Sequence, residues 1–405
     1  MDEDVYLLKT IAYRAYGHAF RFRTSQELFS SHDIDTGTRF LLRTLVENGL
    51  EQSSLILDLG CGYGPLGLIM KKLNPLAGVH LVDRDALAVS YARQNAELND
   101  LVVPDIYGSL GYDDVRRNDF DLIVSNIPGK AGESVITCLV REAKYYLAPG
   151  GTAAVVVVGP LEAAVAAILE STPGAEIILR RKRSGHTVFH YRFNGNYREE
   201  KPSGTGLERG IYHRDRVNIE INAVNYTIQT ARGLPEFDSL NYKTGMLLQS
   251  LSTIGLPADT GTGLVLNPGQ GHVPVTLWKK VRPREILLAD RDLLALRYSR
   301  NNLLLNGCPS EQVNIRHCAG IDPEPGVDID LAIGVLREEE GRRANYLTVM
   351  NAAAGLSPRR MMVLAAGSTA ITRLVADLGE QPALRIVKRE KRKGNGLLVL
   401  QPFGV

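Results

Sequence analysis

The chain repeats itself at long range, and this repeat limits its possible folds more than any other feature. The repeated pairs are 55–65 with 264–274, 81–95 with 288–302, 121–128 with 330–337 and, more faintly, 33–42 with 239–248. The separation stays close to 207–209 residues over segments that are far apart, which chance does not explain. A length of 405 residues accommodates two domains of the common size of about 100–200 residues. The sequence therefore predicts a tandem duplication of a whole domain.

Each half alternates short apolar runs with helix-period stretches. The first half has expected strands at 55–59, 79–82, 120–125 and 153–158 and expected helices at 67–73, 86–99 and 132–147. Strands that alternate with helices predict an α/β fold with a mostly parallel sheet covered on both faces. Residues 175–183 and 187–193 flank a Ser-Gly-His turn, which predicts that the sheet ends in an antiparallel hairpin.

A polar, glycine-bearing segment without periodicity separates the two halves. We therefore expect a first domain over 1–195, a linker over 196–210 and a second domain over 211–405. No apolar run approaches the roughly 18 residues that a membrane span needs. We expect a soluble, cytoplasmic protein without a membrane contact.

Charge and cysteine content exclude several classes of site. A net charge of +2 gives no strong overall field toward nucleic acid or membrane, so any basic site must be local. Cys61, Cys138, Cys308 and Cys318 show no paired C-x-x-C spacing. This pattern favours reduced thiols over disulfides, and we expect no metal site.

A glycine turn follows the first strand of the repeat. Gly60, Gly62 and Gly64 let a backbone pass close under a ligand, but their spacing differs from the dinucleotide fingerprint. Asp58 adds a carboxylate that would repel pyrophosphate and attract a cation. Asp83, at the end of the next strand, can accept hydrogen bonds from ribose hydroxyls. A nucleoside with a cationic group fits both acids, and S-adenosylmethionine is the common one.

The strand that ends at Asn126 leads into Ile127 and Pro128. The Asn126 side-chain carbonyl and the Ile127 backbone carbonyl can accept hydrogen bonds from an exocyclic amine, while Pro128 stiffens the turn. Such a turn supplies positioning rather than covalent chemistry. We therefore predict Asn126 and Pro128 as catalytic residues, with Asn126 also beside the methyl donor.

Asp58-Leu-Gly-Cys-Gly-Tyr-Gly, Asp83 and Asn126-x-Pro128 together resemble class I S-adenosylmethionine-dependent methyltransferases. The upstream Ile34-Asp35-x-Gly37-Thr38 segment resembles, more narrowly, the tandem ribosomal RNA guanine-N2 methyltransferases of the methyltransferase small domain family. This resemblance implies two Rossmann-like methyltransferase domains. It also places Asp35, Gly37 and Thr38 beside the methionine end of the donor, although Asp35 and Thr38 could equally cap a helix.

The sequence departs from this family at two points. Gly129 replaces the aromatic residue that would stack on a flipped base. This replacement removes a stacking contact worth roughly 1–3 kcal/mol. Phe29 or Tyr107 could take its place. The second departure is the order of the halves, because the related enzymes carry the inactive half first.

The second half has lost groups that the chemistry needs. On the sequence alone Asp58 becomes Asn267, Gly64 becomes Val273, and Asn126-Ile-Pro128 becomes Val335-Leu-Arg337, while Asp290 persists. We expect a degenerate domain that acts as a structural support or substrate platform. Basic clusters recur at 180–183 and 388–393; they fit either RNA phosphates or a solvated sheet edge.

The leading hypothesis is an S-adenosylmethionine-dependent methyltransferase that acts on an exocyclic amine, guanine N2, of ribosomal RNA. Two alternatives stay open at this point. The acceptor could be a protein or a small molecule, because Gly129 removes the usual base platform. The chain could also be a non-catalytic RNA-binding assembly factor that retains a nucleoside pocket.

Overall fold

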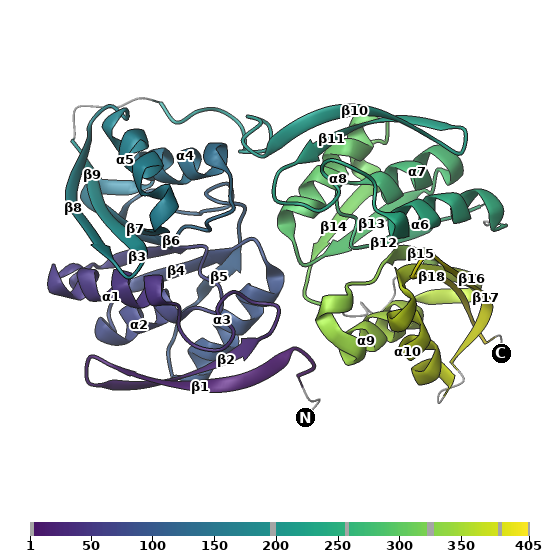
Figure 1. Cartoon of the computed structure of the whole chain (residues 1–405), viewed down its shortest axis with the longest axis horizontal. Coiled ribbons are helices and arrows are strands. Elements are labelled where there is room, and N and C mark those ends of the chain that lie inside the picture. Colours follow the sequence, from purple (N-terminus) through teal and green to yellow (C-terminus); the bar gives the residue numbers. More distant parts are fainter. Residues whose placement is uncertain (1–3, 195–199, 256–258, 322–327, 380–382, 404–405) are drawn as a thin grey trace. The chain divides into compact units, whose positions relative to one another are not determined.

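A computed structural model describes residues 4–194, 200–255, 259–321, 328–379 and 383–403. The chain forms two compact units, each with its own sheet (Figure 1). The first unit is Leu7–Tyr212, and the second unit is His213–Val405 together with Met1–Tyr6. The predicted linker 196–210 begins in residues that lie outside the described part of the chain.

The first unit is built on a seven-stranded sheet in the order β5-β4-β3-β6-β7-β9-β8, plus a separate hairpin, β1-β2. Strands β3 to β7 run parallel, and β9 and β8 close the sheet antiparallel. Its strands are β1 (Leu7–Ala15), β2 (His18–Ser25), β3 (Leu55–Leu59), β4 (Gly78–Asp83), β5 (Asp105–Gly108), β6 (Phe120–Asn126), β7 (Leu147–Val158), β8 (Ala175–Arg183) and β9 (His186–Phe193). Its α-helices are α1 (Thr36–Glu47), α2 (Pro65–Leu73), α3 (Ala86–Leu98), α4 (Glu133–Arg141) and α5 (Glu162–Glu170).

The second unit has the same sheet, in the order β14-β13-β12-β15-β16-β18-β17, and its own hairpin, β10-β11. Its strands are β10 (His213–Ile221), β11 (Val224–Ala231), β12 (Thr262–Leu266), β13 (Glu285–Asp290), β14 (Val313–His317), β15 (Ile329–Val335), β16 (Leu356–Gly367), β17 (Leu384–Arg392) and β18 (Asn395–Pro402). Its α-helices are α6 (Tyr242–Thr253), α7 (His272–Val281), α8 (Leu293–Leu305), α9 (Gly341–Ala354) and α10 (Ser368–Gly379). The predicted fold class, mostly parallel sheets that end in antiparallel strands, is confirmed.

Helices cover both faces of each sheet, which explains why the central strands are apolar throughout. In the first unit α1, α2 and α3 lie on one face and α4 and α5 on the other (Figure 1). The core under α4 and α5 contains buried residues of β3, β6 and β7, such as Leu57, Ile123 and Val155. The parallel arrangement brings the carboxyl ends of β3, β4 and β6 to one edge of the sheet.

The hairpin β1-β2 is held on the first unit by Asn95 of α3 and by Asn99, which caps the end of that helix. Asn99 accepts from the Arg21 N–H at 2.9 Å and donates to the Arg21 carbonyl at 2.7 Å. Asn95 accepts from the Arg23 N–H at 2.7 Å and donates to the Tyr63 carbonyl at 2.9 Å. Asn95 thus links the hairpin to the glycine turn. In the second unit Asn302 of α8 and Asn306, which caps that helix, make the equivalent bonds.

One predicted element differs from the structure. We expected a helix over 132–147 that ends at the Pro149-Gly-Gly segment, but α4 ends at Arg141 and a 3-10 turn follows over Glu142–Tyr145. Strand β7 then begins at Leu147, with a shift in register before Thr152. Gly151 permits this irregularity because a Cβ there would lie 2.7 Å from the Phe120 carbonyl oxygen. The glycines therefore serve a strand irregularity, not a helix end.

Among the helices that the structure describes, none is long and apolar enough to cross a membrane.

Candidate active site

The predicted site residues of the first unit gather at the carboxyl edge of its sheet. The glycine turn follows β3, Asp83 ends β4 and Asn126 ends β6, and β3 lies between the other two strands. Asp58 pairs with Leu81 of β4 and Val124 of β6, so the three strand ends are level. A ligand that crosses the end of β3 can therefore contact Asp83 and Asn126 together.

The glycine turn presents bare backbone at this edge. Gly60, Gly62 and Gly64 have φ values of +79°, +56° and +90°, which side chains rarely adopt. Apart from the glycine and its two chain neighbours, no described residue has an atom within 4 Å of a Cβ built at Gly60 or Gly62. Gly64 instead packs inward, because its Cβ would lie 2.9 Å from Leu68 Cδ1. The first two glycines thus face open space where a ligand can lie against the backbone.

Asp83 joins the turn to the next helix. Its carboxylate accepts from the Gly62 N–H and the Asp85 N–H, each at 2.9 Å. Burial raises the pKa of Asp83, and these two hydrogen bonds oppose the rise. Each carboxylate oxygen can accept a further hydrogen bond, so Asp83 keeps the capacity to bind hydroxyl groups.

Asp58 lies under the turn rather than in the open. Asp58 is only 1% exposed, and its carboxylate accepts a hydrogen bond from the Gly67 N–H of α2 at 2.8 Å. Burial raises the pKa of Asp58 to about 7, and the nearby Asp83 carboxylate raises it as well. Ionisation of Asp58 near neutral pH is therefore favoured by a cation close to the turn.

Asn126 is fixed by two residues at the start of α1. Its Nδ2 donates to Asp35 Oδ2 at 2.9 Å and to Thr38 Oγ1 at 3.0 Å. Asp35 also caps α1 by accepting from the Thr38 N–H at 3.1 Å. A carboxylate only accepts, so the amide nitrogen must face Asp35 and the Oδ1 oxygen must face away. Asp35 therefore caps α1, as one alternative predicted, while Thr38 lies inside the helix; the place of both residues beside a methyl donor stays a prediction.

The turn after Asn126 is anchored to the sheet. The Ile127 N–H donates to the Val156 carbonyl at 3.0 Å, and the Pro128 carbonyl accepts from the Ala131 N–H at 3.1 Å. Two aromatic residues were candidates to replace the stacking platform missing at Gly129, and the suggestion of Tyr107 is wrong. Tyr107 as a residue is only 7% exposed, and the Arg116 guanidinium covers its ring, 4.2 Å from the ring centre. Phe29 is 73% exposed and stays a candidate.

The strand register of the second unit corrects the predicted alignment of the two glycine turns. Val265 pairs with Leu288 as Asp58 pairs with Leu81, and Gly271 precedes α7 as Gly64 precedes α2. The counterpart of Asp58 is therefore Val265, not Asn267, and Gly64 is retained as Gly271 rather than replaced by Val273. The sequence alignment was displaced by two residues because a glycine at every second position matches itself after such a shift.

Asn267 instead replaces Gly60. Its N–H donates to the Ala289 carbonyl at 2.9 Å, as the Gly60 N–H does to the Val82 carbonyl. The Asn267 side chain then donates to the Val335 carbonyl at 2.8 Å, at the end of β15. The Asn267 side chain thus occupies a position where the first unit has only the backbone of Gly60.

Arg337 closes the rest of this edge in the second unit. It stands two residues after β15, as Pro128 stands two residues after β6, and it pairs with Asp290, the counterpart of Asp83. Strand β12 lies between β15 and β13, so the arginine side chain crosses the end of β12. Val335, the counterpart of Asn126, offers no side-chain acceptor. Arg337 thus covers, in the second unit, the part of the sheet edge where we predict the ligand in the first unit.

The sheet order, the glycine turn and the strand-end acids define a Rossmann-like class I methyltransferase fold. A solved structure described as a T. thermophilus 16S rRNA guanosine-N2 methyltransferase in complex with AdoMet and guanosine shares this fold over 98% of the present chain and 99% of its own. Its TM-score is 0.67 and its sequence identity 16%.

Sequence comparison supplies the family. Residues 19–184 match the model of the methyltransferase small domain. The uncharacterized protein YbxB of Bacillus subtilis is 31% identical over 144 residues, which cover 35% of this chain and 71% of YbxB. The ribosomal RNA small subunit methyltransferase C of Haemophilus influenzae is 37% identical over 128 residues, which cover 31% of this chain and 37% of that protein.

The chain belongs to the methyltransferase small domain family. The predicted family and enzyme class, an S-adenosylmethionine-dependent methyltransferase, are therefore confirmed. The aligned segments of these two relatives are 144 and 128 residues long, and the aligned part spans 37% of the Haemophilus enzyme.

Proposed function

We propose that the first unit transfers a methyl group from S-adenosylmethionine to an exocyclic amine, guanine N2, of ribosomal RNA. The observation that carries this proposal is the fixed orientation of Asn126, whose amide N–H groups are both engaged by α1. The Oδ1 oxygen is thereby held as an acceptor for an amine. The names of the Haemophilus and T. thermophilus relatives support ribosomal RNA as the substrate.

The proposed donor site follows the strand ends. Gly60, Gly62 and Gly64 shape the turn under the donor, and Asp83 binds the ribose hydroxyls. Asp58 acts from beneath the turn, where its charge favours the cationic methionine end. Asp35, Gly37 and Thr38 form the wall beside that end and hold Asn126.

The chemistry needs positioning more than covalent help. The amine nitrogen forms a bond to the methyl carbon while the carbon–sulfur bond breaks and its electron pair stays on sulfur. Asn126 Oδ1 and the Ile127 carbonyl align the nitrogen lone pair, and Pro128 keeps the turn rigid. Alignment of this kind can supply several kcal/mol of the barrier.

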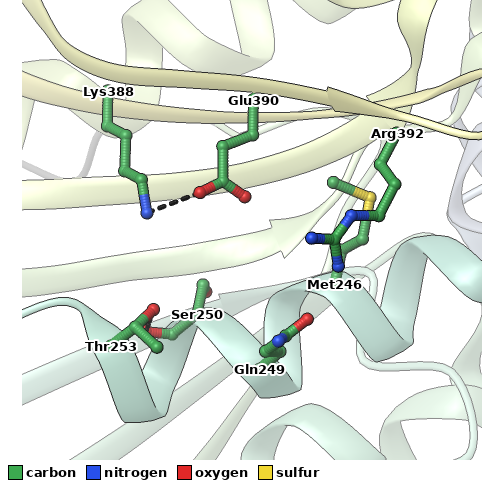
Figure 2. A pocket seen from close by; sticks show the side chains of 7 residues that line it. All are labelled: Met246, Gln249, Ser250, Thr253, Lys388, Glu390 and Arg392. Atoms are coloured by element: carbon green, nitrogen blue, oxygen red, sulfur yellow. Dashed lines mark hydrogen bonds and ion pairs between the residues drawn. The ribbon is translucent and has the colours of Figure 1, made fainter.

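RNA is also the proposed partner of the second unit. A groove between α6 and β17 is lined by Met246, Gln249, Ser250, Thr253, Lys388, Glu390 and Arg392. Figure 2 shows Lys388 and Arg392 from β17 facing the helix across this groove. On β8, the corresponding hairpin strand of the first unit, Arg181 pairs with Glu47. In the groove of the second unit Lys388 pairs with Glu390 at 2.6 Å, whereas Arg392 has no acidic partner among the described residues. Arg392 therefore favours phosphate binding by the second unit.

The test is transfer of labelled methyl from S-adenosylmethionine to naked ribosomal RNA, ribosomal subunits and total protein in parallel. We expect label in RNA, its loss in Asn126→Ala and its retention in Asn314→Ala, a matched change at an exposed asparagine of the second unit. Label in protein or in a small molecule would select the alternative acceptor. Donor binding without any label would select a non-catalytic RNA-binding factor. An enzyme of ribosomal RNA would act in the cytoplasm.

A further inference from the structure

His186 stands at the same sheet edge as the proposed site. It begins β9 and pairs with Val158, the last residue of β7. Two residues earlier on β7, Val156 pairs with Asn126 of β6. The hairpin tip is tied to the end of β7 because the Gly159 N–H donates to the Gly185 carbonyl at 2.7 Å. The imidazole is thus carried to the carboxyl edge next to the catalytic turn.

The ring orientation leaves a basic nitrogen at this edge. His186 Nδ1 lies 3.1 Å from the Ser184 carbonyl oxygen. A carbonyl oxygen only accepts, so Nδ1 carries the hydrogen and the neutral ring has its lone pair on Nε2. A Cβ built at Gly37 would lie 2.9 Å from His186 Cδ2, 3.3 Å from its Nε2 and 2.8 Å from Asp35 Oδ2. The Nε2 edge therefore faces the helix start that holds Asn126.

The second unit keeps the hydrogen bond that closes the hairpin but has no histidine at this position. Asn395 begins β18 as His186 begins β9, and its Nδ2 donates to the Lys393 carbonyl at 2.9 Å. The hydrogen bond that closes the hairpin is therefore kept, whereas the basic nitrogen is lost. It is lost in the unit that also lacks the Asn126 acceptor, where Val335 ends the strand.

We propose that His186 Nε2 accepts the proton that the acceptor amine releases on methylation. This inference rests on the proposed function. When the amine nitrogen bonds to the methyl carbon and the carbon–sulfur bond breaks, the nitrogen carries one proton in excess. That proton passes to Nε2, the neighbouring Asp35 carboxylate stabilises the imidazolium, and solvent then removes the proton.

Other charged groups on the same elements have their own partners. Arg183 of β8 is opposite His186 in register. The adjacent ion pairs are Lys182 with Glu162 on the hairpin side, and Arg39 with Asp33 on the α1 side.

The test is single-turnover methyl transfer to RNA as a function of pH in wild type, His186→Asn and His213→Asn. His186→Asn copies the second unit and can keep the hairpin bond, and His213 is an exposed histidine of the second unit. We expect His186→Asn to lower the rate by about 10²-fold at neutral pH, to flatten the dependence of the rate on pH, and to regain rate with added imidazole. Donor binding by calorimetry should stay within a few-fold.

Two results would count against these proposals in different ways. If wild type methylates RNA and His186→Asn keeps both the rate and the pH profile, the inference is wrong and the proposed function stands. If wild type binds the donor but methylates nothing, the proposed function itself fails and the inference falls with it. Should His186→Asn lose donor binding or unfold early, His186→Gln and imidazole rescue decide the same question.

Discussion

The two units share a backbone and differ in what they place at the end of one strand. Both sheets have the same strand order, and both hairpins are bound by paired asparagines. In the first unit the end of β3 is bare glycine backbone flanked by Asp83 and Asn126. In the second unit Asn267 and Arg337 reach across the matching space. The comparison shows that the fold can be kept while the site is lost, because the residues that maintain the fold differ from those that form the site.

The largest expected effect comes from giving the first unit the strand end of the second. Asn126→Val removes the amine acceptor and leaves Asp35 and Thr38 without their shared donor. We expect methyl transfer to fall by about 10³-fold or more, roughly 4 kcal/mol of transition-state stabilisation. Donor affinity should change much less. Measurement of transfer rate and donor binding side by side checks this, and full activity in Asn126→Val would refute the role of the turn.

The next effect concerns the stability of the second unit. Arg337→Ala leaves Asp290, whose side chain is fully buried, without its guanidinium partner. We expect a loss of about 3–5 kcal/mol in the free energy of unfolding of this unit, because a buried charge loses its counter-ion. Denaturant unfolding with a reporter in the second unit measures the change. Methyl transfer by the first unit should persist, and Arg342→Ala, at a more exposed ion pair, should cost under about 1 kcal/mol.

A pH-dependent difference follows from Asp58, which the second unit replaces with Val265. Burial raises the pKa of Asp58 to about 7 from 3.8, so the folded chain keeps a proton in this interval that the unfolded chain has released. The stability linked to this proton is complete below about pH 4 and is lost as pH rises through about 7. We expect Asp58→Asn to gain about 1–3 kcal/mol relative to wild type between pH 5 and pH 8. Urea midpoints at the two pH values check the sign, and an unchanged difference would show that Asp58 is ionised throughout.

The smallest expected effect is on RNA binding by the groove in the second unit. Lys388→Ala together with Arg392→Ala should weaken RNA binding by about 10-fold at low salt and should lower the salt dependence of binding. Arg392 should account for most of this loss, because Lys388 already pairs with Glu390. The comparison change in the first unit is Arg181→Ala on β8, whose cation pairs with Glu47 and should matter less. Filter binding over a salt series separates the two variants. Equal losses would mean that both hairpins contact RNA.

Sequence patterns located most of the proposed site because its residues stand at the ends of apolar strands. The strand over 55–59 and the glycine turn were predicted residue by residue, and Asp83 and Asn126 follow from the same rule. The asparagines of α3 and α8 recur in the repeat, yet nothing local shows that they bind a distant hairpin. His186 was assigned only to a turn, since its contact with Gly37 joins segments about 150 residues apart.

The predictions that failed rest on local sequence patterns that are compatible with more than one structure. A glycine at every second position matches itself after a shift of two residues, so only the strand pairs of β12 with β13 fixed the alignment. Pro149-Gly-Gly can end a helix or bend a strand, and the close approach of Phe120 to Gly151 decides for the strand. Tyr107 could have been a stacking platform until the structure placed Arg116 over its ring.

The sequence by itself determined the duplication, the α/β class and the turn where the chemistry is expected, because these depend on periodicity and on residue types at the ends of strands. Only the tertiary structure decided which residues meet. It turned the Asn126 amide toward Asp35, placed His186 over Gly37 and laid Arg337 across the second unit's strand ends. Such contacts join distant segments, and their geometry follows from strand register and packing, which no short stretch of sequence contains.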